Sequence, residues 1–145
     1  MEDLNIGIYD FASPEYDEAV SRRYEVLRKP LGLEFTAQQL AEEYADIHIG
    51  AWTKDGMVGT LIMSQLDHGM VKMRQVAVSE GVQSQGAGSA LVRFSEHWAI
   101  SKGFTKLVLH ARDTAVPFYK KLGYKSIGDA FVEVGITHQK MGKDL

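Results

Sequence analysis

The stretch V-Q-S-Q-G-A-G-S-A, Val82 to Ala90, follows a segment with strand character and precedes one with helical periodicity. It places Gly86 and Gly88 at the turn between the two, and Ser89 and Ala90 keep the first helical turn small. The first N–H groups of a helix have no intrahelical partner and carry the positive end of the helix dipole. The turn therefore predicts a site where backbone N–H groups hold a phosphate or pyrophosphate.

A structural explanation of the same glycines stays open, because Gly-Ala-Gly would also let a helix pack closely on a strand. Two familiar nucleotide motifs do not fit. The residues after Gly88 lack the third glycine of a dinucleotide fingerprint, and the turn lacks the G-K-[ST] of a P-loop.

Upstream of the turn, the pattern predicts an antiparallel meander of three strands. The strands are Ile47 to Thr53, Met57 to Leu66 and Met70 to Val78, joined by the turns Lys54-Asp55-Gly56 and Asp67-His68-Gly69. Both turns end in glycine, where a positive φ is expected.

Downstream, a helix is predicted from Ala87 to a stop at Gly103, with Leu91, Phe94 and Trp98 on one face. Lys106 to Ala111 is predicted as a strand. Because one helix joins it to Met70 to Val78, the two strands are candidates for a parallel pair.

The first part of the chain predicts a strand and two helices. The strand is Asn5 to Phe11, and Ser13 caps a helix that stops near Lys29-Pro30. Thr36 caps a short helix from Ala37 to Tyr44.

The last part predicts one more helix and two strands. Asp113 or Thr114 caps a helix through Lys121, which Gly123 ends. Strands follow over about Tyr124 to Val134 and Ile136 to Met141. The whole order indicates an α+β, or mixed α/β, fold with one central sheet.

Composition is that of an ordinary globular protein. The 145 residues carry a net charge of -3, with 45% apolar residues and no cysteine. A chain of this length suits one domain, residues 1–145, that buries about two thirds of its unfolded surface. Mild acidity argues against a nucleic-acid partner, and the lack of cysteine excludes disulfides, zinc-thiolate sites and a cysteine nucleophile. No stretch predicts a signal peptide or membrane span, so a cytoplasmic location without membrane attachment is expected.

Two motifs together resemble the GCN5-related N-acetyltransferases (GNAT). The first is Q-x-x-G-x-G, here Gln83, Gly86 and Gly88, after the strand M-R-Q-V-A-V. The second is A-R-D-T-A-V-P-F-Y-K-K-L-G-Y, Ala111 to Tyr124. The resemblance covers roughly Ile47 to Met141 and implies a GNAT-like, mostly antiparallel mixed sheet flanked by helices.

The resemblance also implies a binding site for acetyl-CoA as cosubstrate, without a metal. Backbone N–H groups at the turn would hold the pyrophosphate, and the backbone around Val76 to Val78 would pair with the pantetheine arm. Asp113 stands where many members have asparagine, and it could accept a bond from the arm. The implied coenzyme-binding residues are Val76, Ala77, Val78, Gln83, Ser84, Gln85, Gly86, Ala87, Gly88, Ser89, Asp113 and Tyr119.

The catalytic candidates are Tyr119, Glu133 and His138. Tyr119 aligns with the family tyrosine near the coenzyme sulfur and is the candidate acid; packing of the helix on the sheet is its other explanation. The strand before the turn reads Met73-Arg74-Gln75, without the glutamate that serves many members as base.

The base is therefore sought in F-V-E-V-G-I-T-H-Q-K-M, at Glu133 and His138. This ending, like V-L-R-x-P-L-G at Val26 to Gly32, resembles a bacterial subgroup of the family. A site shared by Glu133 and His138 requires a turn or bulge at Gly135, since five residues along one straight strand place them on opposite faces. A buried His138 satisfied by Glu133 is the structural alternative.

Arg28 and Glu133 are the candidates for acceptor binding, with a solvated helix-end charge as the alternative for Arg28. His48, His68, His97 and His110 show no metal-ligand spacing and are assigned to surface or packing. The predicted function is acetyl transfer from acetyl-CoA to a primary amine of a small molecule or protein, in a ternary complex. A non-catalytic acyl-CoA sensor is the alternative. The sequence leaves the oligomeric state open, with a homodimer as one option because dimers are common among similar proteins.

Overall fold

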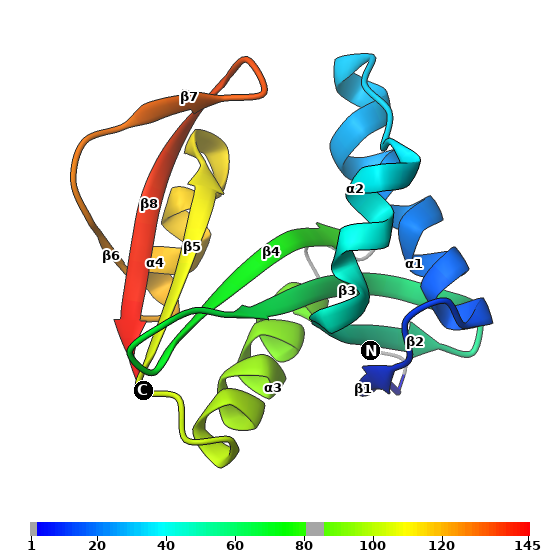
Figure 1. Ribbon diagram of the computed structural model, residues 1–145, viewed down its shortest axis with the longest axis horizontal. Coiled ribbons are helices and arrows are strands. Elements are labelled where there is room, and N and C mark those ends of the chain that lie inside the picture. Colours follow the sequence, from blue (N-terminus) through cyan, green and yellow to red (C-terminus); the bar gives the residue numbers. More distant parts are fainter. Residues whose placement is uncertain (1–2, 81–85) are drawn as a thin grey trace. The chain divides into compact units, whose positions relative to one another are not determined.

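The computed structural model describes residues 3–80 and 86–145. The chain packs as two compact units. Unit 1 comprises Met1–Ser64 and Gln75–Ser95, and unit 2 comprises Gln65–Arg74 and Glu96–Leu145. The strands, labelled in Figure 1, are β1 Asn5–Tyr9, β2 Ile47–Thr53, β3 Gly56–Gln65, β4 Met70–Val78, β5 Lys106–Arg112, β6 Lys125–Ser126, β7 Phe131–Glu133 and β8 Ile136–Asp144.

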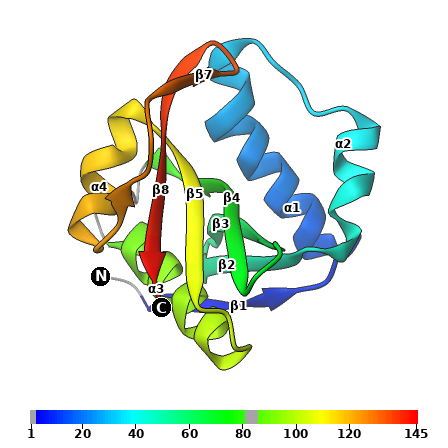
Figure 2. The ribbon, with the colours of Figure 1, turned by 60° about the vertical axis from the view of Figure 1, so that its left-hand side comes forward.

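These strands form one mixed sheet. Their order is β1-β2-β3-β4-β5-β8-β6, and β7 pairs with β8. β4 and β5 run parallel, from Met70 opposite Lys106 to Met73 opposite Leu109. β5 and β8 are antiparallel and lie side by side in Figure 2. The predicted parallel pair and the mostly antiparallel sheet flanked by helices are therefore confirmed.

The first helical segment of unit 1 changes pitch along its length. α1, Pro14–Arg23, begins where the Ser13 side chain accepts the N–H of Tyr16. A π-helical turn, Tyr24–Arg28, and a 3-10 turn, Lys29–Leu31, carry the chain to Gly32, which has φ +68°. The predicted cap is confirmed, whereas the change of pitch was not predicted.

The second helical segment confirms the predicted cap at Thr36. α2, Ala37–Ala41, begins with a capping box between Thr36 and Gln39, and a 3-10 turn continues it over Glu42–Ala45. The apolar core nearby includes Tyr9, Tyr16, Ala19 and Met57.

Unit 2 is built on β5. Leu107, Leu109 and Ala111 alternate along one face of β5 and are buried. In register with them lie the buried Val71 and Met73 of β4 and Met141 of β8. The opposite face carries the buried Val108 and the polar residues Lys72, His110 and Lys140.

The helices that come after β4 and β5 along the chain are each followed by a glycine, as predicted. α3, Ala87–Ser101, is followed by Gly103 at φ +87°. α4, Val116–Lys121, is followed by Gly123 at φ +96°.

Three boundary predictions are wrong. The first strand ends at Tyr9, two residues before Phe11. Asp113 and Thr114 do not cap a helix with their side chains, because Asp113 opens a 3-10 turn, Asp113–Ala115, that leads into α4.

The single strand predicted over Tyr124 to Val134 is the third. It is two short strands, β6 and β7, because Gly128 turns the chain with φ +72° between them. The Gln139 side chain of β8 donates to the Gly128 carbonyl at 3.0 Å, which holds the interruption in place.

Candidate functional site

The glycine turn before α3 has a conformation that only glycine adopts readily. Gly86 has φ +84°, and a Cβ built on it would meet no heavy atom within 4 Å. Ala90 donates its N–H to the Gly86 carbonyl at 3.0 Å, which closes the first turn of α3. Close packing therefore does not explain this glycine. Gln83, Ser84 and Gln85 lie outside the described residues, while Ala87 is buried and Ser89 half-buried.

β4 is irregular at Gln75, just before the residues expected to meet the pantetheine arm. Gln75 has φ +54°, a left-handed conformation that is costly for a non-glycine residue and recurs at functional sites. Its side-chain oxygen is buried without a hydrogen-bond partner. Ala77 is 1% exposed, and Val76 and Val78 are half-buried.

Tyr119 lies on α4 and is 6% exposed. Its ring packs edge-on against Phe118 and Tyr124, with centroids 5.0 and 5.6 Å apart. Burial raises the pKa of Tyr119 to about 12. The hydroxyl is therefore a weak acid suited to donating a hydrogen bond. Asp113 is exposed at the start of its 3-10 turn.

The hairpin formed by β7 and β8 places Glu133 beside a histidine that was not expected there. Val134 and Gly135 form its two-residue turn with φ +48° and +75°, so the predicted turn at Gly135 is present. Glu133 Oε2 lies 3.1 Å from Nδ1 of His110. His138 instead places its Nδ1 2.8 Å from the carbonyl oxygen of Ile136.

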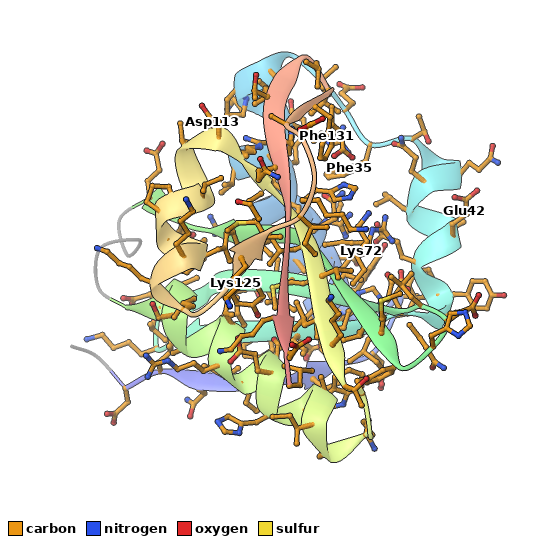
Figure 3. The ribbon with its side chains drawn as sticks, turned by 90° about the vertical axis from the view of Figure 1, so that its left-hand side faces the viewer. Phe35, Glu42, Lys72, Asp113, Lys125 and Phe131 are labelled. Carbon is orange, nitrogen blue, oxygen red and sulfur yellow. The ribbon has the colours of Figure 1, made fainter. Side chains whose placement is uncertain are left out.

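Phe131 of β7 lies against both histidines. Its ring meets His110 edge-on at 4.9 Å and stacks on His138 at 5.9 Å. Figure 3 labels Phe131 and Lys72, which come from β7 and β4. His138 is 6% exposed, whereas the His110 side chain is 30% exposed.

The surroundings on this face lower the pKa values of two basic side chains, His110 and Lys72. Burial and the nearby Lys72 lower the pKa of His110, and they outweigh the opposing effect of Glu133. Burial and the positive charge of Arg74 lower the pKa of Lys72. The ammonium group of Lys72 makes no hydrogen bond or ion pair with any residue in 3–80 or 86–145.

Arg28, the candidate for acceptor binding, belongs to unit 1. Its guanidinium lies 4.6 Å from the centre of the Phe35 ring, and Arg23 lies 4.7 Å from the same ring. Arg23 is neutralised by Glu43 at 2.8 and 2.6 Å. Within residues 3–80 and 86–145, Arg28 has no acidic partner.

His110 and Lys72 are the polar residues that sequence reasoning missed. The sequence pattern assigns His110 to surface or packing, and it does not distinguish Lys72 from other exposed strand lysines. The alternation in K-L-V-L-H-A-R does place His110 on the polar face of its strand. Its pairing with Glu133, which is 23 residues later, depends on the strand register.

The described residues contain neither a metal-binding cluster nor a membrane-spanning helix. No cluster of three or more His, Cys, Asp or Glu in this part of the chain could hold a metal ion. Over the same residues, no helix is long and apolar enough to cross a membrane.

A family model described as "Acetyltransferase (GNAT) domain" matches residues 13–145. The chain belongs to the GNAT acetyltransferase family. A curated relative, the uncharacterized N-acetyltransferase YjcF of Bacillus subtilis, is 33% identical over 81 residues. That match covers 55% of this chain and spans 58% of the relative's length.

Solved structures of GNAT proteins show the same fold. An acyl-CoA N-acyltransferase from Pseudomonas aeruginosa has a TM-score of 0.82 at 19% identity, with 97% of this chain and 99% of that chain covered. An aminoglycoside 6'-N-acetyltransferase complexed with coenzyme A has a TM-score of 0.79 at 18% identity, with 97% and 96% covered. At these identities the likeness concerns the fold alone.

Proposed function

We propose that this protein is an N-acetyltransferase that moves the acetyl group of acetyl-CoA to a primary amine by direct attack in a ternary complex. Membership in the GNAT family supports acyl transfer. The chain has no cysteine to form an acyl-enzyme, so direct attack is the natural scheme. One observation carries the coenzyme part of the proposal: Gly86 has a left-handed φ and open surroundings at the start of α3.

The residues present fit a coenzyme. Backbone N–H groups from Gln83 to Ser89 would hold the pyrophosphate, since glycine at 86 leaves the approach to the helix start unobstructed. The backbone of Val76, Ala77 and Val78 would pair with the pantetheine arm, with Asp113 as a further acceptor. Acetyl-CoA supplies a thioester, whose carbonyl carbon is open to attack by an amine.

Tyr119 is proposed to assist departure of the sulfur. Its pKa of about 12 exceeds the ~8.5 of a thiol, so complete proton transfer to the thiolate is uphill. A hydrogen bond donated by the hydroxyl would still stabilise the developing negative charge. The hydroxyl is available for this, because it makes no hydrogen bond with any group of the described residues.

The acceptor is proposed to carry a negative group as well as its amine. The Arg28 guanidinium lies over the face of the Phe35 ring. The N–H groups at the edge of the guanidinium are therefore left to bind a carboxylate or phosphate. Glu133 stays a proposed contributor to proton removal and acceptor binding on the C-terminal hairpin. His138 is left out of the proposal, because its ring is buried and its Nδ1 bonds to the Ile136 carbonyl oxygen. A single domain over residues 1–145, a cytoplasmic location and a homodimer are further parts of the proposal that rest on the sequence.

The test combines binding and turnover. The purified protein is titrated calorimetrically with acetyl-CoA and then assayed for thiol release with a panel of amines, including pairs with and without a carboxylate. Binding with turnover supports the enzyme, and preference for the carboxylate member supports the role of Arg28. Binding without turnover would favour the acyl-CoA sensor. No binding would contradict the proposal that the glycine turn holds the pyrophosphate of acetyl-CoA.

A matched pair of variants isolates the role of Gly86. Gly86→Ala and Gly128→Ala each place a Cβ in open space at a left-handed φ, +84° and +72°, so both add similar backbone strain. We expect Gly86→Ala to weaken acetyl-CoA binding at least tenfold, because the strain alters the turn that holds the pyrophosphate. Gly128→Ala should leave binding within twofold. Equal affinity for both variants would refute the assignment.

A further inference from the structure

Two histidines on one face of unit 2 differ in what holds their rings. His110 of β5 and His138 of β8 both lie against Phe131. His138 is buried, and its Nδ1 bonds to the carbonyl oxygen of Ile136 on its own strand. His110 is 30% exposed, and its Nδ1 bonds to the carboxylate of Glu133.

The carboxylate determines which nitrogen of His110 carries the proton. A carboxylate accepts hydrogen bonds, so Nδ1 must be the donor at 3.1 Å from Glu133 Oε2. In the neutral ring, Nε2 then carries the lone pair. Nε2 makes no hydrogen bond within residues 3–80 and 86–145, and it is not among their buried unpartnered atoms. It is therefore open to a proton from outside the protein.

The charged groups that act on His110 come from three strands. β4 contributes Lys72, β7 contributes Glu133, and β8 contributes Lys140. Arg74, also on β4, acts on Lys72. Burial and the cations Lys72 and Lys140 lower the pKa of His110 below 6.5, although Glu133 opposes them. Its ring is thus mainly neutral at pH 7 and ready to accept a proton.

We propose that His110 is the base that takes the proton from the acceptor's ammonium group, and that Glu133 is its positioning residue. This inference rests on the proposed acetyl transfer. His138 supports Phe131 and does not take part in proton transfer. The base predicted from the sequence at His138 is thereby moved to a neighbouring strand, while Glu133 keeps a role.

The proton balance is complete. Nε2 of His110 removes one proton from the ammonium, which leaves a neutral amine with a lone pair and makes an imidazolium. The amine nitrogen forms a bond to the acetyl carbon as the carbon–sulfur bond breaks. The second proton lost by the nitrogen goes to the departing sulfur, and the imidazolium returns its proton to water.

The kinetic test compares His110→Asn with the matched variant His138→Asn, at saturating acetyl-CoA and with the best amine of the panel. At pH 7, His110→Asn should lower kcat/KM at least 100-fold, the usual contribution of a positioned base. Its rate should recover as rising pH deprotonates the amine in solution. His138→Asn should stay within about fivefold, and both variants should bind acetyl-CoA as wild type does.

The outcomes separate the two hypotheses. If the wild type turns over and His110→Asn matches it, or His138→Asn shows the larger loss, only the assignment of His110 fails. If the wild type binds acetyl-CoA but acetylates no amine, the proposed function fails and this inference fails with it.

A second measurement does not depend on turnover. NMR titration of the His110 ring should show Glu133→Gln lowering its pKa and Lys72→Met raising it, because the first change removes an anion and the second a cation. The acid limb of kcat/KM should move in the same two directions. Lys72→Arg, which keeps the charge, should leave the titration unchanged. If neither Glu133→Gln nor Lys72→Met moves the His110 midpoint, the pairing is not the one inferred here.

Discussion

Unit 1 and unit 2 each pair a carboxylate with a nitrogen cation or ring, in opposite surroundings. In unit 1, Arg23 and Glu43 form two hydrogen bonds with side chains that are 1% and 4% exposed. In unit 2, His110 and Glu133 share one contact, at exposures of 30% and 47%. Breaking the buried pair should lower the free energy of unfolding more. The pKa values of the exposed pair should respond more to neighbouring charges.

The physical reason lies in desolvation. A charge left alone in the interior loses its hydration without compensation, whereas a half-exposed group recovers water. The Nε of Arg23 is already buried without a hydrogen-bond partner, so Arg23 depends on Glu43 for the compensation it has. The same substitution, glutamate to glutamine, should therefore have unlike consequences in the two units.

The largest effect is expected from Glu43→Gln. It leaves the buried Arg23 guanidinium without a counter-charge, and losses of this kind cost about 3–5 kcal/mol. The free energy of unfolding, measured by urea titration at pH 7, should fall by that amount. A loss below about 1 kcal/mol would show that Arg23 reaches water when its partner is removed.

Tyr16→Phe should have an intermediate effect on the same network. It removes a hydroxyl that donates to Glu43 Oε1 at 2.8 Å in a buried position. Loss of a buried hydrogen bond to a charged group costs about 1.5–3 kcal/mol. Urea unfolding of Tyr16→Phe in the Glu43→Gln background should show a smaller loss than in the wild type, and strict additivity would contradict the coupling.

Acid should weaken unit 1 through the same carboxylate. Burial raises the pKa of Glu43, but the hydrogen bonds and charge of Arg23 outweigh burial and hold this pKa below 4.5. The stability gained from the depressed pKa is present above the unfolded value and is lost as pH falls through the folded one. The free energy of unfolding should thus fall below pH 4.5, and less steeply in Glu43→Gln; parallel curves would disprove the contribution.

The smallest effect on stability is expected from Glu133→Gln. Contacts between half-exposed charges contribute little, about 0–1 kcal/mol. The free energy of unfolding of Glu133→Gln, measured by urea titration, should therefore fall by less than that of Tyr16→Phe. A loss as large as that of Glu43→Gln would mean that the hairpin pairing is structural, and would remove the contrast between the two units.

The elements of the fold that could be predicted from sequence are those whose cause lies within a few residues. Ser13 and Thr36 are caps because their side chains reach N–H groups three residues away. Gly103 and Gly123 end helices because glycine tolerates a positive φ. The break at Gly128 was missed because the apolar residues around it continue the pattern of a strand.

The candidate site was predicted in part. The glycine turn, Tyr119 and the Gly135 turn follow from local patterns, and the structure gives Gly86 the conformation that such a turn requires. The irregular backbone of Gln75 carries no sequence signal, since glutamine is not a residue that favours φ of +54°. Lys72 also carries no sequence signal, because a lysine on the polar face of a strand is ordinary.

The sequence by itself determined the family, the order of helices and strands as far as α4, and the turn before α3. Only the tertiary structure decided that Glu133 meets His110 rather than His138, and that Arg23 meets Glu43. Caps, turns and alternation act over three or four residues, so they can be read directly from the chain. The partner of a charged side chain depends instead on how elements 20 or more residues apart in the chain pack together, as the separations of Arg23 from Glu43 and of His110 from Glu133 show.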